Sequence, residues 1–530
     1  MFVFEIVIAL LLGGAGLAAL ARRISTPYPA LVALAGAALA LLPRAPTLVL
    51  DPELALTLFV APVLLDAAFD ASPRDLRANW RAVTSLALGA VALTVIVVAF
   101  TVHALVPAIP WAAAIALGAI VAPPDAAAAT AVLKQLRPPH HLLVILEGES
   151  LFNDASALLI YRIAVASTVA GFVIGWRVIP LLLFVTVGSV VLGIVLSRVV
   201  LFINSKIDDV ATSVIVQFCG TFGVWLLAES LHLSGILTVV VFAMTISRIA
   251  ANVMPARIRV PSYAVWEVAV FVLNILAFIL IGFQLKLIIE RLSRPTLIRY
   301  GWIAAAICVA TILARIAWVT GAAAFSRWRC RPRPDGKTGP LDAVALTPGG
   351  AAVVGWCGMR GTVTLAAALA LPAEFPYRDL ILFTSFAVVL GTLVVQGVTL
   401  RPLIKLLDLP PDDAVEREVR LARAEILRAA LAACETCAGS ETAALVRRRY
   451  ELLLRRAEAE LASGAGDGAF DAASARALPE DAEAVRAATA AERQRLTALR
   501  AEGTIGDAAF QVIEQELDLE ELDLELLVRA

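Results

Sequence analysis

Long apolar runs alternate with short polar segments over the first three quarters of the chain. A helix needs about 20 predominantly apolar residues to cross the hydrocarbon core of a membrane, and about 13 runs between Met1 and Lys405 are candidates. We therefore predict an all-α polytopic membrane protein. The predicted spans are 3–20, 28–43, 54–71, 81–103, 110–133, 142–170, 179–203, 210–231, 234–247, 262–289, 298–325, 346–371 and 379–404.

Lys and Arg residues in the loops set the expected orientation. If the chain has 13 spans, one set of alternate loops carries about 17 Lys and Arg residues and the other set about 7. The set with more positive residues is expected in the cytoplasm. The N-terminus then lies outside. The first span is expected to stay as a helix, because a signal peptide carries its positive charge before the apolar run, whereas Arg22 and Arg23 follow it.

The segment 406–530 differs in composition from the transmembrane domain expected over 1–405. Charge-rich stretches with helical spacing cover 412–462 and 480–502, and a Gly/Ala/Ser-rich break, SGAGDGAFDAASA, separates them. The final stretch FQVIEQELDLEELDLELLV has the leucine spacing of an amphipathic helix. We predict a helical cytoplasmic tail, acting either as a solvated appendage that aids assembly or as a regulatory element.

The amino-acid composition further limits the class of protein and its possible partners. Of 530 residues, 60% are hydrophobic and only 17% charged, and the net charge of -1 argues against a nucleic-acid partner. The six cysteines form no secreted disulfide framework. Cys434 and Cys437 make a single Cys-x-x-Cys in the tail, far in sequence from the four histidines, so a chance pair is favoured over a metal or redox site. No cofactor is expected.

Ionisable side chains inside an apolar span are costly unless they face a cavity or a partner, so each indicates a function. Within LEGESLFNDASALLIY, Ser150 and Asp154 are four residues apart and share one helix face, with Asn153 and Glu149 on the neighbouring row. Their oxygens suit a small hard cation, and the carboxylate can alternatively take a proton. The candidates in the whole chain are Asp66, Asp70, Asp125, Glu147, Glu149, Asp154, Arg162, Glu229, Glu267, Arg315 and Arg360.

The structural alternatives differ between these residues. Glu149 is expected to be a scaffold residue that pairs with Arg315, because a second buried acid needs a cation to neutralise it. Glu147, Asp70 and Arg162 lie near span ends, where we expect their side chains to reach the membrane interface, and they are left out of the site.

Two spans are interrupted near their middle. Pro123 and Pro124 interrupt the fifth, and glycines surround Arg360 in the segment GWCGMRGTVTLAAALALP of the twelfth. Interruptions at matching places in two halves are typical of transporters built from two inverted repeats with crossing helices. Asp125 and Arg360 would then compensate the positive and negative helix ends respectively. The alternative is a hinge or a glycine packing face without ligands.

These motifs together resemble one known family. GESLFNDASALLIY resembles the Gly-Glu-Ser…Asn-Asp signature of the monovalent cation:proton antiporters of the sodium/proton exchanger type, and GMRGTVTLAAALALP resembles its Gly-x-Arg-Gly helix. LSGILTVVVFAMTIS, VWEVAVFVLNILAFILIGFQL and ILARIAWV match in the same order. The resemblance covers residues 1–405, and the tail is similar to that of a bacterial branch.

The resemblance implies roles for individual residues. Asp154 matches the aspartate that carries the ion and the proton, and Asn153 matches the asparagine before it. Ser150 matches a cation-coordinating serine, and Asp66 matches an acidic residue lining the same site. Na⁺ would accordingly be held by Asp154, Ser150 and Asp66. The Asn-Asp pair marks members that exchange one cation for one proton electroneutrally.

Other positions carry supporting roles, with one departure from the pattern. Glu149 and Arg315 match a pair that holds two core helices together, and Arg360 matches an arginine near the twelfth-span break. The fifth span of the family usually reads Thr-Asp-Pro, whereas here Pro124 takes the place of the threonine and precedes Asp125. A backbone carbonyl could still bind the ion there, but the side-chain hydroxyl is lost.

The expected function is exchange of Na⁺ (or Li⁺) for H⁺ by alternating access, serving sodium transport and pH homeostasis. The family implies one bundle that moves and one that forms a homodimer within the lipid bilayer, here a bacterial inner membrane. A K⁺/H⁺ antiporter and, more remotely, a cation channel are the alternatives. An enzyme is disfavoured because His140 and His141 are adjacent, which is not metal-ligand spacing, and no Ser/His/Asp set is evident.

Overall fold

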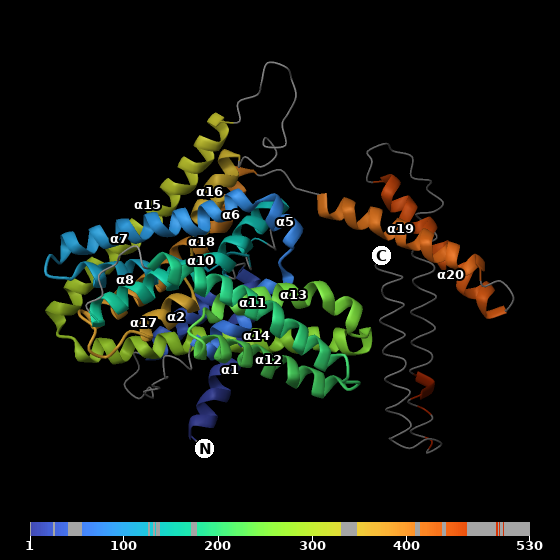
Figure 1. Cartoon of the computed structure of the whole chain (residues 1–530), viewed down its shortest axis with the longest axis horizontal. Helices are drawn as coiled ribbons and strands as arrows, with labels where there is room; N and C mark the ends of the chain where they lie inside the picture. The colour runs from blue at the N-terminus through green and yellow to red at the C-terminus, as the bar shows by residue number, and fades with distance from the viewer. Residues whose placement is uncertain are drawn as a thin grey trace. The chain divides into compact units, whose positions relative to one another are not determined.

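The computed structural model describes most of the chain, and the described residues form helices joined by turns and short extended segments (Figure 1). The predicted all-α class is confirmed for this part of the chain. Two compact units are present, Met1–Pro411 and Asp412–Ala530. The described residues are 2–24, 27–40, 56–125, 128–130, 133, 138–170, 178–329, 347–408, 414–436, 441–463, 494–496, 498 and 502.

The first unit contains helices that overlap every predicted span. They are α1 (Phe2–Ile24), α2 (Tyr28–Ala40), η1 (Leu56–Val60), α4 (Ala61–Asp70), α5 (Pro73–Ala78), α6 (Trp80–Thr84), η2 (Ser85–Ala90), α7 (Val91–Leu105), α8 (Trp111–Val121), α10 (His140–Ala170), α11 (Val178–Asn204), α12 (Val210–Ser230), α13 (Gly235–Val253), α14 (Ala256–Arg291), α15 (Arg294–Arg329), α16 (Pro348–Trp356), α17 (Thr362–Leu369) and α18 (Arg378–Leu407). Among the described residues, six helical segments are long and apolar enough to cross a membrane. The number of about 13 spans and the inverted repeats stay predictions.

Local capping explains why the eighth and ninth predicted spans are separate helices. Asp209 accepts hydrogen bonds from the backbone N–H groups of Ala211 and Thr212, at 3.1 and 2.8 Å, and so begins α12. Ser234 caps α13 in the same way. Between them the chain turns through His232, whose φ of 57° is left-handed. The division expected at 232–234 is confirmed.

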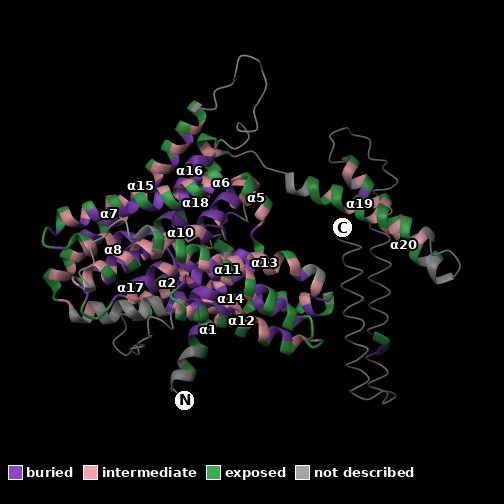
Figure 2. Ribbon diagram, in the orientation of Figure 1, coloured by how far each residue is buried: buried purple, intermediate pink, exposed green. Residues whose placement is uncertain are grey.

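The helices pack in neighbouring groups. In one group α8 contacts both α7 and α10, and α15 contacts α7, α16 and α18. In the other, α14 contacts α1 and α2, while α13 contacts α4 and α11. One large apolar cluster joins residues of α2, α7, α8, α10 and α14–α18, and a smaller one joins α4 to α11, α12, α13 and α17. Figure 2 shows buried positions along α8, α10 and α18.

Helix α8 lies deep in the larger cluster, and its composition explains why. It is apolar on every side, which is typical of a helix with protein all around it, and eight of its residues are buried. Gly118 faces α7 so closely that a Cβ there would lie 2.8 Å from the carbonyl oxygen of Val95. The absence of a side chain at Gly118 therefore allows the backbones of α7 and α8 to approach each other.

The second unit is described mainly over two amphipathic helices, α19 (Ala414–Thr436) and α20 (Glu441–Ser463), which pack against each other. Arg428 of α19 pairs with Glu458 of α20, with 2.8 Å between Nη2 and Oε1. The predicted helical stretch 412–462 is thus two helices. Most of 480–502, the final amphipathic stretch and Cys437 lie outside the described residues, and Cys434 is a free thiol.

Adding one methyl group at Gly118 should destabilise the protein. Gly118→Ala forces α7 and α8 apart, and overpacking of this kind costs about 1–3 kcal/mol. Thermal unfolding of the protein in detergent is expected to show a lower midpoint than the wild type. Gly321→Ala on α15 is the matched control, because nothing lies within 4 Å of a Cβ there. Equal midpoints for the two variants would contradict the packing argument.

Candidate functional site

Two helices break and their breaks lie against each other. Helix α8 ends at Val121, and residues 123–125 are non-helical because Pro123 and Pro124 lack the N–H groups that would continue it. Helices α16 and α17 are separated by the non-helical residues 357–361. The backbone N–H of Asp125 donates to the carbonyl of Met359 at 2.7 Å, which joins the two interruptions directly.

Arg360 satisfies carbonyl groups that the break in α8 leaves without helical partners. Its side chain is fully buried, its Nε donates to the carbonyl of Val121 at 2.9 Å, and its Nη1 donates to the carbonyl of Gly358. Its backbone N–H donates to Thr392 Oγ1 at 3.1 Å, which fixes the break to α18. A cation at this position also matches the negative end of the α8 dipole.

Asp125 lies at the opposite kind of helix end. Its carboxylate packs against the backbone of Gly361, immediately before α17 begins, so closely that a Cβ on residue 361 would overlap it. Glycine is therefore required at this position. The N-terminus of a helix carries partial positive charge, so the carboxylate of Asp125 is favourably placed against α17.

Helix α10 is attached to this crossing through its Asn-Asp pair. Asn153 is fully buried, and its Nδ2 donates to the carbonyl of Pro124 at 3.1 Å. Asp154 is only 5% exposed. The amide of Asn153 thus provides the hydrogen bond that the interrupted α8 cannot provide for Pro124, and it fixes the position of Asp154 relative to the break.

One cavity of about 150 Å³ brings five of the sequence-predicted ion-site residues together. Asp154 and Ser150 come from α10, Asp66 from α4, and Pro124 and Asp125 from the break. Asn153 does not line it but holds its wall through Pro124. Among the described residues no group of three or more His, Cys, Asp or Glu is arranged to hold a metal ion. A cation here would therefore need hydroxyl or carbonyl oxygens as well.

Sequence reasoning missed several polar residues of the same cavity, namely Asp70, Thr130, Glu147, Asn274, Thr362 and Thr364. Asp70 and Glu147 were left out of the site, but both line the cavity. The helical period explains this: Asp70 is one turn beyond Asp66, and Glu147 is two turns before Asp154. Asn274, a single amide within the apolar run FVLNILAF, was a signal that the sequence did offer.

Glu149 and Arg315 form a buried, bidentate ion pair. Arg315 Nη2 lies 2.8 Å from Glu149 Oε2, its Nη1 contacts Oε1, and the side chains are only 1–2% exposed. The Nε and Nη2 of Arg315 also donate to the carbonyl of Val354, at 3.3 and 3.1 Å. The pair thus connects α10, α15 and α16 at one point.

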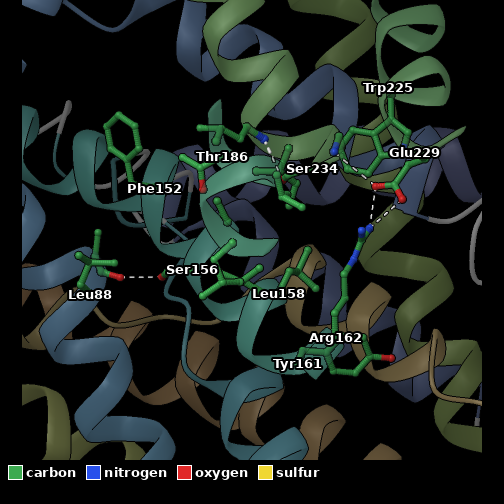
Figure 3. A pocket seen from close by; sticks show the side chains of 18 of the residues that line it. Leu88, Phe152, Ser156, Leu158, Tyr161, Arg162, Thr186, Trp225, Glu229 and Ser234 are labelled. Carbon is green, nitrogen blue, oxygen red and sulfur yellow. Dashed lines mark hydrogen bonds and ion pairs between the residues drawn. The ribbon is translucent and has the colours of Figure 1, made fainter. Parts of the chain in front are cut away.

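A second ion pair attaches α10 to the junction of α12 and α13, in the wall of a cavity of about 2450 Å³ (Figure 3). Arg162 donates to both carboxylate oxygens of Glu229, at 2.7 and 2.8 Å. The backbone N–H of Gly235 donates to the same carboxylate at 3.4 Å. Arg162, which the sequence indicated would reach the interface, is half exposed and also has a protein partner.

Removing one member of the buried pair should be far more damaging than removing one of the half-exposed pair. Glu149→Gln leaves the charge of Arg315 buried and uncompensated, which costs about 3–5 kcal/mol. Glu229→Gln, the matched control beside Arg162, should cost about 0–1 kcal/mol. Unfolding midpoints measured in detergent check the difference. Similar losses in both variants would show that burial does not govern the cost.

Comparisons with known proteins all point to one family of cation/proton exchangers. The family described as "Sodium/hydrogen exchanger, transmembrane" matches residues 6–406. An uncharacterized Na⁺/H⁺ exchanger of Mycobacterium tuberculosis is 31% identical in an alignment of 527 positions, which covers 95% of this chain and 93% of that protein. A sodium, potassium, lithium and rubidium/H⁺ antiporter of Bacillus subtilis is 32% identical over 395 residues, 71% of this chain and 57% of that protein.

A solved structure shares the fold. The sodium proton antiporter MjNhaP1 from Methanocaldococcus jannaschii aligns with a TM-score of 0.59, covering 77% of this chain and 99% of that chain, at 17% sequence identity. The sequence match extends over most of the helices described above, including both broken helices and the cavity between them. The chain therefore belongs to the sodium/hydrogen exchanger family of integral membrane transporters.

Proposed function

We propose that this protein exchanges Na⁺ or Li⁺ for H⁺, one for one, across a bacterial inner membrane by alternating access. The observation that carries the proposal is the cavity shared by Asp154, Ser150 and Asp66 beside the crossing of two broken helices. Its oxygens are ligands that hard cations prefer, and the enclosing protein replaces the bulk water around a bound ion.

The chemistry of exchange follows from competition for one carboxylate. Asp154 carries either a proton or, together with Ser150 and Asp66, a cation. Loaded with either, the carboxylate is neutralised, and an empty buried carboxylate is the costly state. Movement is therefore favoured only with cargo, which couples the flow of cations to the opposite flow of protons. The Asn153 amide keeps the carboxylate beside the break throughout.

The moving part should be the group of helices joined by the buried ion pair. Glu149 and Arg315 tie α10 to α15 and α16, and α8 is packed against α10. In this proposal the group moves against α1, α2, α4 and α11–α14, which include the surface for a homodimer. The excess of Lys and Arg in alternate loops supports an outer N-terminus and a cytoplasmic tail.

Exchange of K⁺ for H⁺ is the second candidate. The Bacillus subtilis relative is named as an antiporter of sodium, potassium, lithium and rubidium, so cations of several sizes occur among the substrates of related proteins. The missing hydroxyl at Pro124 bears on the same question, because it removes one side-chain ligand from the break. A cation channel would instead show conductance far above carrier turnover in a bilayer recording.

Cation-dependent proton movement should depend on Asp154. Wild-type proteoliposomes holding a pH dye are expected to respond to Na⁺ or Li⁺, with the response to K⁺ deciding between the two candidates. Asp154→Asn should abolish the response, because an amide can neither take up the proton nor supply a negative charge. Asp208→Asn, the same change at an exposed carboxylate beside Arg257, is the matched control and should transport normally. Persistent exchange in Asp154→Asn would place the ion site elsewhere.

Proton and cation should also compete at equilibrium. Below the pKa of the shared carboxyl group, the apparent KM for Na⁺ should rise about tenfold for each unit by which the pH falls, because protons occupy the site in proportion to their concentration. Initial rates measured in proteoliposomes between pH 6 and pH 9 test this, with equal pH on both sides. An apparent KM that stays constant over that range would exclude a shared carboxylate whose pKa lies within or above it.

A further inference from the structure

One residue that lines the ion cavity carries a hydroxyl group that no role yet assigned explains. Thr364, on α17, lines the cavity and is only 1% exposed. Its Oγ1 is buried and has no hydrogen-bond partner among the described residues. Burial of a hydroxyl without a partner is unfavourable, so such groups are uncommon in folded proteins.

The helix break explains why this hydroxyl lacks the partner that helical threonines commonly use. Thr94, Thr311 and Thr392 donate to the carbonyl one turn earlier, at 2.7, 2.6 and 2.8 Å. The corresponding position for Thr364 is Arg360, which lies in the non-helical segment before α17 begins. Its carbonyl is therefore not part of a regular turn beneath Thr364.

The oxygen atoms around the cavity indicate that the Thr364 hydroxyl could serve as a cation ligand. The carboxylates of Asp154 and Asp66 and the hydroxyl of Ser150 belong to lining residues of α10 and α4. Pro124 brings no side-chain oxygen, and its carbonyl already accepts a hydrogen bond from Asn153. Hard cations commonly take six or more oxygen ligands in proteins, so neutral oxygens are needed beside the carboxylates. Several other polar residues line this cavity, but among the described lining residues only Thr364 has a buried side-chain oxygen without a hydrogen-bond partner.

We infer that Thr364 Oγ1 is a ligand of the transported cation, supplied from α17 in addition to the carboxylates of α10 and α4. The inference rests on the proposed function of this cavity and adds a residue to it. A hydroxyl has two lone pairs, so it can coordinate a cation without adding charge to the site. A cation held in this way connects α4, α10 and the second broken helix.

The test removes the hydroxyl while keeping the shape of the side chain. Thr364→Val should raise the apparent KM for Na⁺ in proteoliposomes about tenfold, the change expected for one lost contact to a charged species. Thr364→Ser keeps the hydroxyl and should keep the wild-type KM. Thr384→Val is the matched control, because Thr384 Oγ1 is likewise buried without a partner but its residue is not among those lining the cavity.

A second measurement is independent of turnover. Na⁺ should raise the unfolding midpoint of the detergent-solubilised wild type, and a higher Na⁺ concentration should be needed for the same rise in Thr364→Val. Wild-type KM in Thr364→Val, or an equal increase in Thr384→Val, would overturn the inference while leaving the proposed function intact. Unchanged exchange in Asp154→Asn would instead overturn the proposed function and this inference together.

Discussion

The structure depends on hydrogen bonds to the backbone groups that two interrupted helices leave without helical partners inside an apolar core. Where lipid and packed side chains exclude water, each unpaired carbonyl or N–H is costly. Arg360 supplies donors to the end of α8, Asn153 supplies one to Pro124, and Asp125 bonds to Met359. Because these groups satisfy the backbone, the breaks can persist at the centre of the protein, beside the ion cavity.

The same interactions join distant parts of the chain. Asn153 brings α10 to the first break, and Arg360 brings the second break to the first and to α18. Glu149 and Arg315 then tie α10 to α15 and α16. Contacts between α10 and several other helices thus fix the position of the Asp154 carboxylate. We expect a shift of any of these helices to change the shape of the cavity.

Much of this arrangement could be predicted from the sequence. Apolar runs gave the all-helical class, Pro123 and Pro124 gave the break in α8, and ionisable residues in apolar surroundings gave the cavity residues of α10 and α4. Thr364 could not be found in this way, because a threonine near a helix start is ordinary and only the fold shows that its hydroxyl lacks a partner. Asp70 and Glu147 were left out of the site because distance from a span end was weighed above the helical period.

The close approach of Asp125 to Gly361 restricts how this site can change during evolution. Any side chain at residue 361 would meet the carboxylate, so a substitution there requires Asp125 to move. Losing Asp125 first would open the space but would leave the start of α17 without its nearby negative charge. Substitutions at the two positions are therefore coupled, and loss of Asp125 first passes through a protein that has an altered site and still an unsubstituted glycine.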